Sequence, residues 1–125
     1  MLQLTPKSII FLATIPVDFR KGIDGLAAVC RTQLNMNPLD GAIFLFYNNS
    51  RTTIKILTYD GQGFWLFIKR ISKGKFKHKN TVNKNNYQEI CYRSLSILIN
   101  NGDPYSANLS KDWRKIPKQR PTPYN

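Results

Sequence analysis

Two segments of the chain carry residue types that could do chemistry. Residues 18–26, DFRKGIDGL, crowd two acids, two bases and two glycines between apolar side chains. Residues 69–79 carry six cations and no acid. A basic segment can neutralise the phosphates of a nucleic acid without needing a pocket. The first segment could hold a catalytic turn, a phosphate-binding turn or only the start of a helix.

The acids limit what catalysis is available. Phosphoryl chemistry with two metal ions needs several carboxylates that converge on cations about 4 Å apart. Asp40, Asp60 and Asp103 fall in turn or helix-end patterns, where each has a local structural use. Only Asp18 and Asp24 look spare, so the sequence disfavours self-contained metal catalysis. We expect no catalytic residue, no metal and no cofactor.

Residues 18–26 allow two interpretations that remain open. Gly22-Ile23-Asp24-Gly25 is similar to the backbone-clamping loop of KH modules, but that loop needs a preceding helix, and residues 9–13 predict a strand. Helix N-terminal amides flanked by Arg20 and Lys21 could instead bind a phosphate. Alternatively, Asp18 pairs with Arg20 or caps the turn and simply braces the chain.

The elements that must position these residues follow from apolar spacing. Residues 7–13 predict a buried strand, and from Gly22 onward apolar residues recur every three or four positions, which predicts an amphipathic helix that ends near residues 35–38. Residues 42–47, 52–59 and 63–70 are rich in β-branched and aromatic types, and Asn-Asn and Asp-Gly steps between them tolerate the positive φ of tight turns. They predict an antiparallel meander.

The remaining chain predicts a second helix over about 87–100, closed by Asn101-Gly102, and then a basic tail with several prolines over 103–125, partly disordered. We therefore expect a single α+β domain over residues 1–102, with a three- to four-stranded, mainly antiparallel sheet packed by two helices. Cys30 and Cys91 are predicted to be buried, reduced thiols.

One face of the meander could itself be a binding surface. Trp65, Phe67 and Lys69 alternate along the third strand, and three residues of its neighbour, Ile54, Ile56 and Thr58, share that face in one hairpin register. If exposed, the face would be a stacking platform for bases. Since two helices are available, burial of most of these aromatic side chains is favoured.

The overall charge favours a polyanionic partner. Lys and Arg number 19 against 7 Asp and Glu, a formal net charge of +12. Nucleic acids are the common cytoplasmic polyanions. Charges interrupt the first 21 residues too early for a secretory signal, and no apolar run approaches the roughly 20 residues of a membrane span. We expect a cytoplasmic, DNA-associated protein.

Three ordered boxes carry a family resemblance. Residues 18–26 match an Asp-hydrophobic-Arg-Lys-Gly-x-Asp-Gly-Leu box, residues 55–63 match Lys-Ile-Leu-x-Tyr/Trp-Asp-x-x-Gly, and residues 69–76 match Lys-Arg-hydrophobic-x-x-Gly-x-Phe. The chain thereby resembles the small accessory protein, TnpB or Orf2, of insertion sequence 66 family elements. The resemblance covers most of residues 4–76, and the C-terminal third is a looser match. The motif residues of unassigned role are Asp18, Gly22, Asp24, Gly25, Lys55, Asp60, Gly63, Gly74 and Phe76.

The resemblance implies a bacterial mobile-element protein that assists transposition while a separate, larger transposase carries the catalytic acids. It carries over no catalytic residue. With the charge, it predicts a non-catalytic protein that binds DNA electrostatically. The predicted contacts are Lys69, Arg70, Lys73, Lys75 and Lys77, followed by Arg20, Lys21 and Arg51. The alternatives are an adaptor that contacts only the transposase and, more remotely, a metal-dependent nuclease that uses Asp18 and Asp24.

Overall fold

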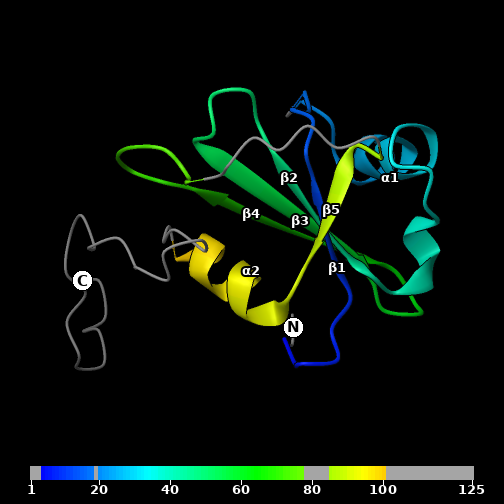
Figure 1. Ribbon diagram of the computed structural model, residues 1–125. Helices are drawn as coiled ribbons and strands as arrows, with labels where there is room; N and C mark the ends of the chain where they lie inside the picture. Colours follow the sequence, from blue (N-terminus) through cyan, green and yellow to red (C-terminus); the bar gives the residue numbers. More distant parts are fainter. Residues whose placement is uncertain (1–3, 19, 78–84, 101–125) are drawn as a thin grey trace, which may run out of the picture.

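The computed structural model describes residues 4–18, 20–77 and 85–100, and these form one open sheet with a helix on each face (Figure 1). The strands are β1 (Ile10–Ala13), β2 (Ile43–Tyr47), β3 (Thr53–Tyr59), β4 (Phe64–Arg70) and β5 (Tyr87–Ile90). The helices are α1 (Ile23–Thr32), the short 3₁₀ helix η1 (Pro38–Asp40) and α2 (Tyr92–Ile99). The predicted tail, residues 103–125, lies outside the described residues.

The sheet has the strand order β4-β3-β2-β1-β5. β2, β3 and β4 form the predicted antiparallel meander. β1 pairs with β2 in parallel, and α1 and η1 form the crossover between them. A parallel neighbour requires such a crossover, because a tight turn can join only antiparallel strands. The α+β prediction is confirmed, and the sheet is a five-stranded mixed one.

Two apolar layers hold the helices on the sheet. α1 packs Leu26 and Cys30 onto the face that carries Phe44 and Phe46 of β2 and Leu57 of β3. On the opposite face, α2 packs Leu95 and Leu98 against a second set: Ile10, Leu12, Ile43, Leu45, Ile54 and Ile56. β2 is buried along its whole length because it lies between both layers, which explains its continuous apolar run.

The prediction that the second helix starts near residue 87 is wrong. Residues Tyr87–Ile90 form β5, which pairs antiparallel with β1, and α2 begins only at Tyr92. Without β5, the outer edge of β1 would leave its backbone N–H and C=O groups unpaired. This pairing outweighs the helical spacing of the side chains. The predicted cap Asn101-Gly102 lies outside the described residues.

Two smaller predictions, the start of the first strand and the left-handed residue of one turn, also differ from the structure. The first strand begins at Ile10 and not at Lys7, because Thr5 to Ser8 form a turn in which the Ser8 N–H donates to the Thr5 carbonyl at 3.0 Å. In the turn between β2 and β3, the left-handed residue is Arg51, with φ of 58°, and not an asparagine. The Asn48 side chain instead accepts hydrogen bonds from the backbone N–H groups of Thr52 and Thr53.

Candidate functional site

Asp18 and Arg20 form an ion pair at the junction between β1 and α1. An Asp18 carboxylate oxygen accepts from the Arg20 backbone N–H at 3.0 Å, and the guanidinium Nη2 lies 2.8 Å from the other carboxylate oxygen. Hydrogen bonds from Arg20 lower the pKa of Asp18 from its ordinary 3.8 to about 2. The bracing interpretation of this segment therefore holds for these two residues.

Gly25 is required at the start of α1 by close packing. A Cβ atom built on Gly25 would lie 2.8 Å from the Cβ of Lys21, which is closer than real side chains approach. Gly22 is the N-cap residue and makes no side-chain cap, and Asp24 supplies an acid in the first turn, where the helix dipole favours it. Since β1 precedes this junction, the helix that a KH loop needs before it is not found there.

Lys55 connects the first two boxes of the family motif. Its side chain is buried at 7% exposure, and its Nζ donates to the Lys21 carbonyl oxygen at 2.9 Å. Through this bond, β3 anchors the junction between β1 and α1. Sequence reasoning missed this role, although the signal was present: Lys55 interrupts the apolar run Ile54 to Leu57, where a solvated cation is not expected.

Asp60 organises the turn between β3 and β4. One carboxylate oxygen accepts from the N–H groups of Gln62 at 2.8 Å and Gly63 at 3.0 Å, and the other accepts from the Trp65 indole at 2.7 Å. These bonds, the backbone bond from Gln62 foremost, lower the pKa of Asp60. The prediction that Asp60 stabilises its own turn is confirmed. Its hydrogen bond from the Trp65 indole was not predicted from the sequence.

The third box is clamped onto the turn between β2 and β3. The Ile71 N–H donates to the Thr52 carbonyl at 3.0 Å, and the Phe76 N–H donates to the Arg51 carbonyl at 2.7 Å. Phe76 is 2% exposed and packs against the Tyr47 ring. Gly74, with φ of 81°, allows the chain to turn between these anchors. The loop that carries Lys73 and Lys75 is therefore fixed at both ends.

These contacts gather the predicted DNA contacts at one end of the sheet. β1, β2 and β4 all finish at this end, because β3 runs antiparallel to both of its neighbours and β1 runs parallel to β2 (Figure 1). We call it the basic end, and it comprises Arg20, Lys21, Arg51, Lys69, Arg70, Lys73, Lys75 and Lys77. Three separate segments of the chain contribute to it.

Members of the basic end differ in what else they contact. Arg70, Lys73 and Lys75 are exposed. Arg20 is held by Asp18, and the Lys69 Nζ donates to the carbonyl oxygen of Ile99 in the last turn of α2 at 2.5 Å. A cation at that position also suits the negative end of the helix dipole. Lys69 thus has a structural role that the sequence did not suggest.

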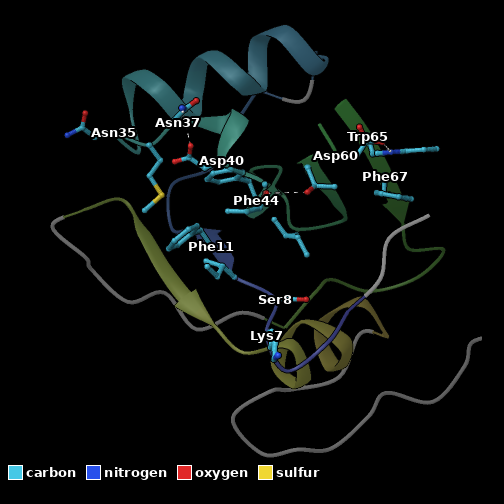
Figure 2. A pocket seen from close by; sticks show the side chains of 16 residues that line it. Lys7, Ser8, Phe11, Asn35, Asn37, Asp40, Phe44, Asp60, Trp65 and Phe67 are labelled. Atoms are coloured by element: carbon cyan, nitrogen blue, oxygen red, sulfur yellow. Dashed lines mark hydrogen bonds between the residues drawn. The ribbon is translucent and has the colours of Figure 1, made fainter. Parts of the chain in front are cut away.

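The opposite end of the sheet contains a pocket of about 840 Å³, which we call the aromatic pocket (Figure 2). Phe11 and Phe44 lie on its floor with ring centroids 5.8 Å apart, and Trp65 and Phe67 form a stacked pair at one side. Its polar rim comes from several loops: Lys7, Ser8, Asn35, Asn37, Asp40 and Asp60. Sequence reasoning missed this pocket, because Phe11 and Phe44 come from strands that only the fold makes neighbours.

The predicted aromatic face exists, but the predicted burial of its aromatic side chains is wrong, because Trp65 is exposed and Phe67 is only half-buried. The register pairs Ile54 with Lys69, Ile56 with Phe67 and Thr58 with Trp65, so the six residues share one face. α2 crosses that face and buries Ile54 and Ile56. Trp65, beyond the reach of α2, keeps 46% of its surface exposed.

The described acids do not converge. Asp18 lies at the junction, Asp24 in α1, Asp40 in η1, Asp60 in a hairpin turn and Glu89 in β5. Within residues 4–18, 20–77 and 85–100, no three side chains of the His, Cys, Asp or Glu type form a group that could hold a metal ion.

The two cysteines differ in environment. Cys30 is buried, and desolvation raises the pKa of its thiol to about 12. The prediction of burial is wrong for Cys91, which is exposed. Cys91 lies between β5 and α2, where its Sγ accepts from the Ser94 N–H at 3.5 Å as the helix cap. A capping position is at the surface because the first turn of a helix begins there.

Comparison with known sequences decides the family. The sequence model described as "IS66 Orf2 like protein" matches residues 8–107. The chain belongs to this family. IS66 Orf2-like proteins are accessory proteins of insertion sequence elements, which indicates a role in transposition. The resemblance carried by the three boxes is confirmed.

Two relatives from Sinorhizobium fredii match this IS66 Orf2-like chain. "Uncharacterized protein y4hO" is 40% identical over 67 residues, which cover 54% of this chain and 58% of the relative. "Uncharacterized protein y4jC" is 39% identical over 116 residues and 90% of each chain. No solved structure matches the chain. In the described residues, no helix is long and apolar enough to cross a membrane.

Proposed function

We propose that this IS66 Orf2-like protein is a non-catalytic accessory factor that binds DNA through the basic end and assists the transposase of its element. The observation that carries the proposal is the convergence of cations from three segments on one end of the sheet. Phosphate contacts supply most of the non-specific affinity for DNA, and they need exposed cations on a rigid support. The clamped loop from Ile71 to Phe76 provides such a support.

The distribution of acids supports the same surface. Among the described residues, Asp40 and Asp60 lie at the aromatic pocket and Glu89 lies in β5 opposite Phe11. The basic end carries Asp18, already paired with Arg20, and Asp24 in α1. Phosphates approaching from the basic end therefore meet mostly cations. The scattered acids also favour a division of labour in which the transposase supplies the catalytic carboxylates.

Arg51 has a backbone conformation that is unfavourable for a residue other than glycine. A non-glycine residue in the left-handed region is uncommon and costs about 1–2 kcal/mol. Gly or Asn would relieve that cost in a hairpin turn. Arginine at this position nevertheless sets a cation next to the loop that carries Lys73 and Lys75.

A salt titration tests DNA binding. Fluorescence anisotropy with labelled duplex DNA would compare the wild type with a Lys73→Ala, Lys75→Ala double variant. We expect the slope of log K against log salt to become shallower by about 0.9 for each phosphate that the variant no longer neutralises. The matched control replaces two cations outside the basic end with alanine, Lys7 at the aromatic pocket and Arg31 in the last turn of α1, and should leave the slope unchanged. Equal slopes for the wild type and the Lys73, Lys75 variant would refute the assignment.

A protein adaptor is the second candidate function, and the exposure of Trp65 beside the aromatic pocket favours it. Aromatic side chains at the rim of a pocket are typical anchors of protein partners. Pull-down of the transposase after nuclease treatment, at high salt, would measure this role. We expect Trp65→Ala to reduce the recovered transposase about tenfold if the pocket is the docking site. Recovery equal to wild type would exclude it.

A further inference from the structure

β4 is an edge strand whose outer side has no partner among the described residues. It spans Phe64–Arg70 without a bulge or proline and contains no acid. Ile68 is 58% exposed on one face of the strand, and Trp65 is 46% exposed on the other. Proteins usually protect such an edge with charges, proline, bulges or a covering element, because free N–H and C=O groups recruit another strand. Here cations occur only at the last two positions, Lys69 and Arg70.

The hydrogen-bond pattern fixes which residues point outward. The Asp60 N–H donates to the Gly63 carbonyl, and the Ile71 N–H donates to the Thr52 carbonyl, at the two ends of the β3–β4 ladder. Since bonded and non-bonded pairs alternate in an antiparallel ladder, Trp65, Phe67 and Lys69 direct their backbone groups toward β3. The backbone groups of Leu66 and Ile68 therefore face outward, as do those of Phe64 and Arg70.

We propose that β4 pairs antiparallel with β4 of a second copy of the chain, about a two-fold axis at Phe67. In this register, Leu66 lies opposite Ile68 of the second copy, and both have outward backbone groups that can bond. Phe67 faces its own equivalent as a non-bonded pair. The same surface then serves both copies, as a two-fold interface requires, and one continuous sheet runs through the dimer.

Charge placement favours a second copy as the occupant. The first half of β4 is aromatic and its second half is cationic, so reversal of the strand sets Lys69 of one copy opposite Trp65 of the other. The Trp65 indole already donates to the Asp60 carboxylate at 2.7 Å. Lys69 of the second copy, which keeps its bond to its own Ile99 carbonyl, therefore approaches a ring that lies beside an acid. Arg70 likewise lies opposite Phe64, whose ring packs against Tyr59 at 5.0 Å. Like charges of the two copies are kept apart.

The salt dependence of this dimer differs in sign from that of DNA binding. Two chains of formal charge +12 repel each other, and added salt screens that repulsion. Dimerisation should therefore strengthen as salt rises, while binding to DNA weakens. Sedimentation velocity over a range of salt and protein concentrations would separate the two associations.

Cysteine cross-linking tests the axis directly. The background variant is Cys91→Ser, which keeps a good helix cap and removes the exposed thiol, while Cys30 stays buried. Under mild oxidation, Phe67→Cys should form a disulfide dimer, because facing non-bonded residues have Cα atoms about 4.5 Å apart. Leu66→Cys or Ile68→Cys alone should cross-link at least tenfold more slowly, since each is offset from its own equivalent by roughly 7 Å along the strand.

A second measurement keeps the proposal testable if Phe67→Cys does not fold. An equimolar mixture of the Leu66→Cys and Ile68→Cys chains should form the mixed disulfide much faster than either chain alone. The exposed substitution Ile68→Lys should raise the dimer dissociation constant roughly tenfold by placing cations at the interface. Fastest cross-linking at residue 66 or 68 alone, equal rates at all three positions, or a wild type that sediments as a monomer even at high salt would each overturn the proposal.

Discussion

The turn between β2 and β3 at the basic end holds Arg51 in the left-handed region, with φ of 58°, whereas the turn between β3 and β4 at the aromatic pocket holds Gly61 there, with φ of 98°. The pocket turn uses the residue that its backbone prefers, and Asp60 stabilises it with local bonds. The basic turn keeps a cation in a costly conformation and relies on contacts from a distant loop. The pocket turn thus has the residue type that its backbone favours, whereas the basic turn has an arginine where its backbone favours glycine or asparagine.

The largest effect should come from the anchor of the basic loop. Phe76→Ala removes a ring that is 2% exposed and packed on Tyr47, and such truncations cost about 3–5 kcal/mol. Urea unfolding would show this decrease in the free energy of unfolding. Leu39→Ala, on a side chain in η1 that is 53% exposed, is the control and should change stability by less than about 0.5 kcal/mol. A Phe76 variant as stable as wild type would show that the loop is not clamped as described.

A smaller effect, of opposite sign at the two ends, should come from the left-handed residues. Arg51→Gly relieves backbone strain and should raise the free energy of unfolding by about 1 kcal/mol, while making the salt slope for DNA binding shallower by about 0.9. Gly61→Ala introduces the same strain at the pocket end and should lower stability by about 1 kcal/mol. If both variants are less stable than wild type, Arg51 is retained for contacts that its side chain makes within the fold.

The smallest effect should come from the exposed Asp18–Arg20 pair. The folded pKa of Asp18, about 2, is depressed below its ordinary 3.8, so its stabilisation is present above pH 3.8 and is lost as the pH falls toward 2. The urea midpoint of Asp18→Asn should lie slightly below that of wild type near neutral pH and converge with it in strong acid. A double-mutant cycle with Arg20→Ala isolates the pair. A difference that persists at pH 2 would assign the effect to something other than the carboxylate charge.

Most of the meander was predictable because its signals are local. Residues 42–47, 52–59 and 63–70 alternate or run apolar between turn residues, and the observed β2, β3 and β4 differ from these ranges by one residue at their starts. β5 was not predictable from its own residues. Tyr87–Ile90 satisfies helical spacing, and its strand conformation depends on β1, which is far away in the sequence.

The candidate site likewise has one part that local sequence signals predict and another that depends on contacts between distant segments. Exposed cations over residues 69–77 follow from composition, since Lys and Arg are rarely buried. Their proximity to Arg51 depends on the bond from Phe76 to Arg51, and the link from Lys55 to Lys21 depends on how α1 enters the fold. Such contacts join residues that no local pattern relates.

The position of β1 has a consequence for synthesis on the ribosome. Its two neighbours in the sheet are β2, which is the first strand of the meander, and β5, which follows the whole meander in the sequence. A nascent chain can fold β2, β3 and β4 as hairpins while it emerges, but β1 keeps an open edge until Ile90 has left the exit tunnel. We therefore expect nascent chains that stop before β5 to be the ones that engage chaperones or aggregate.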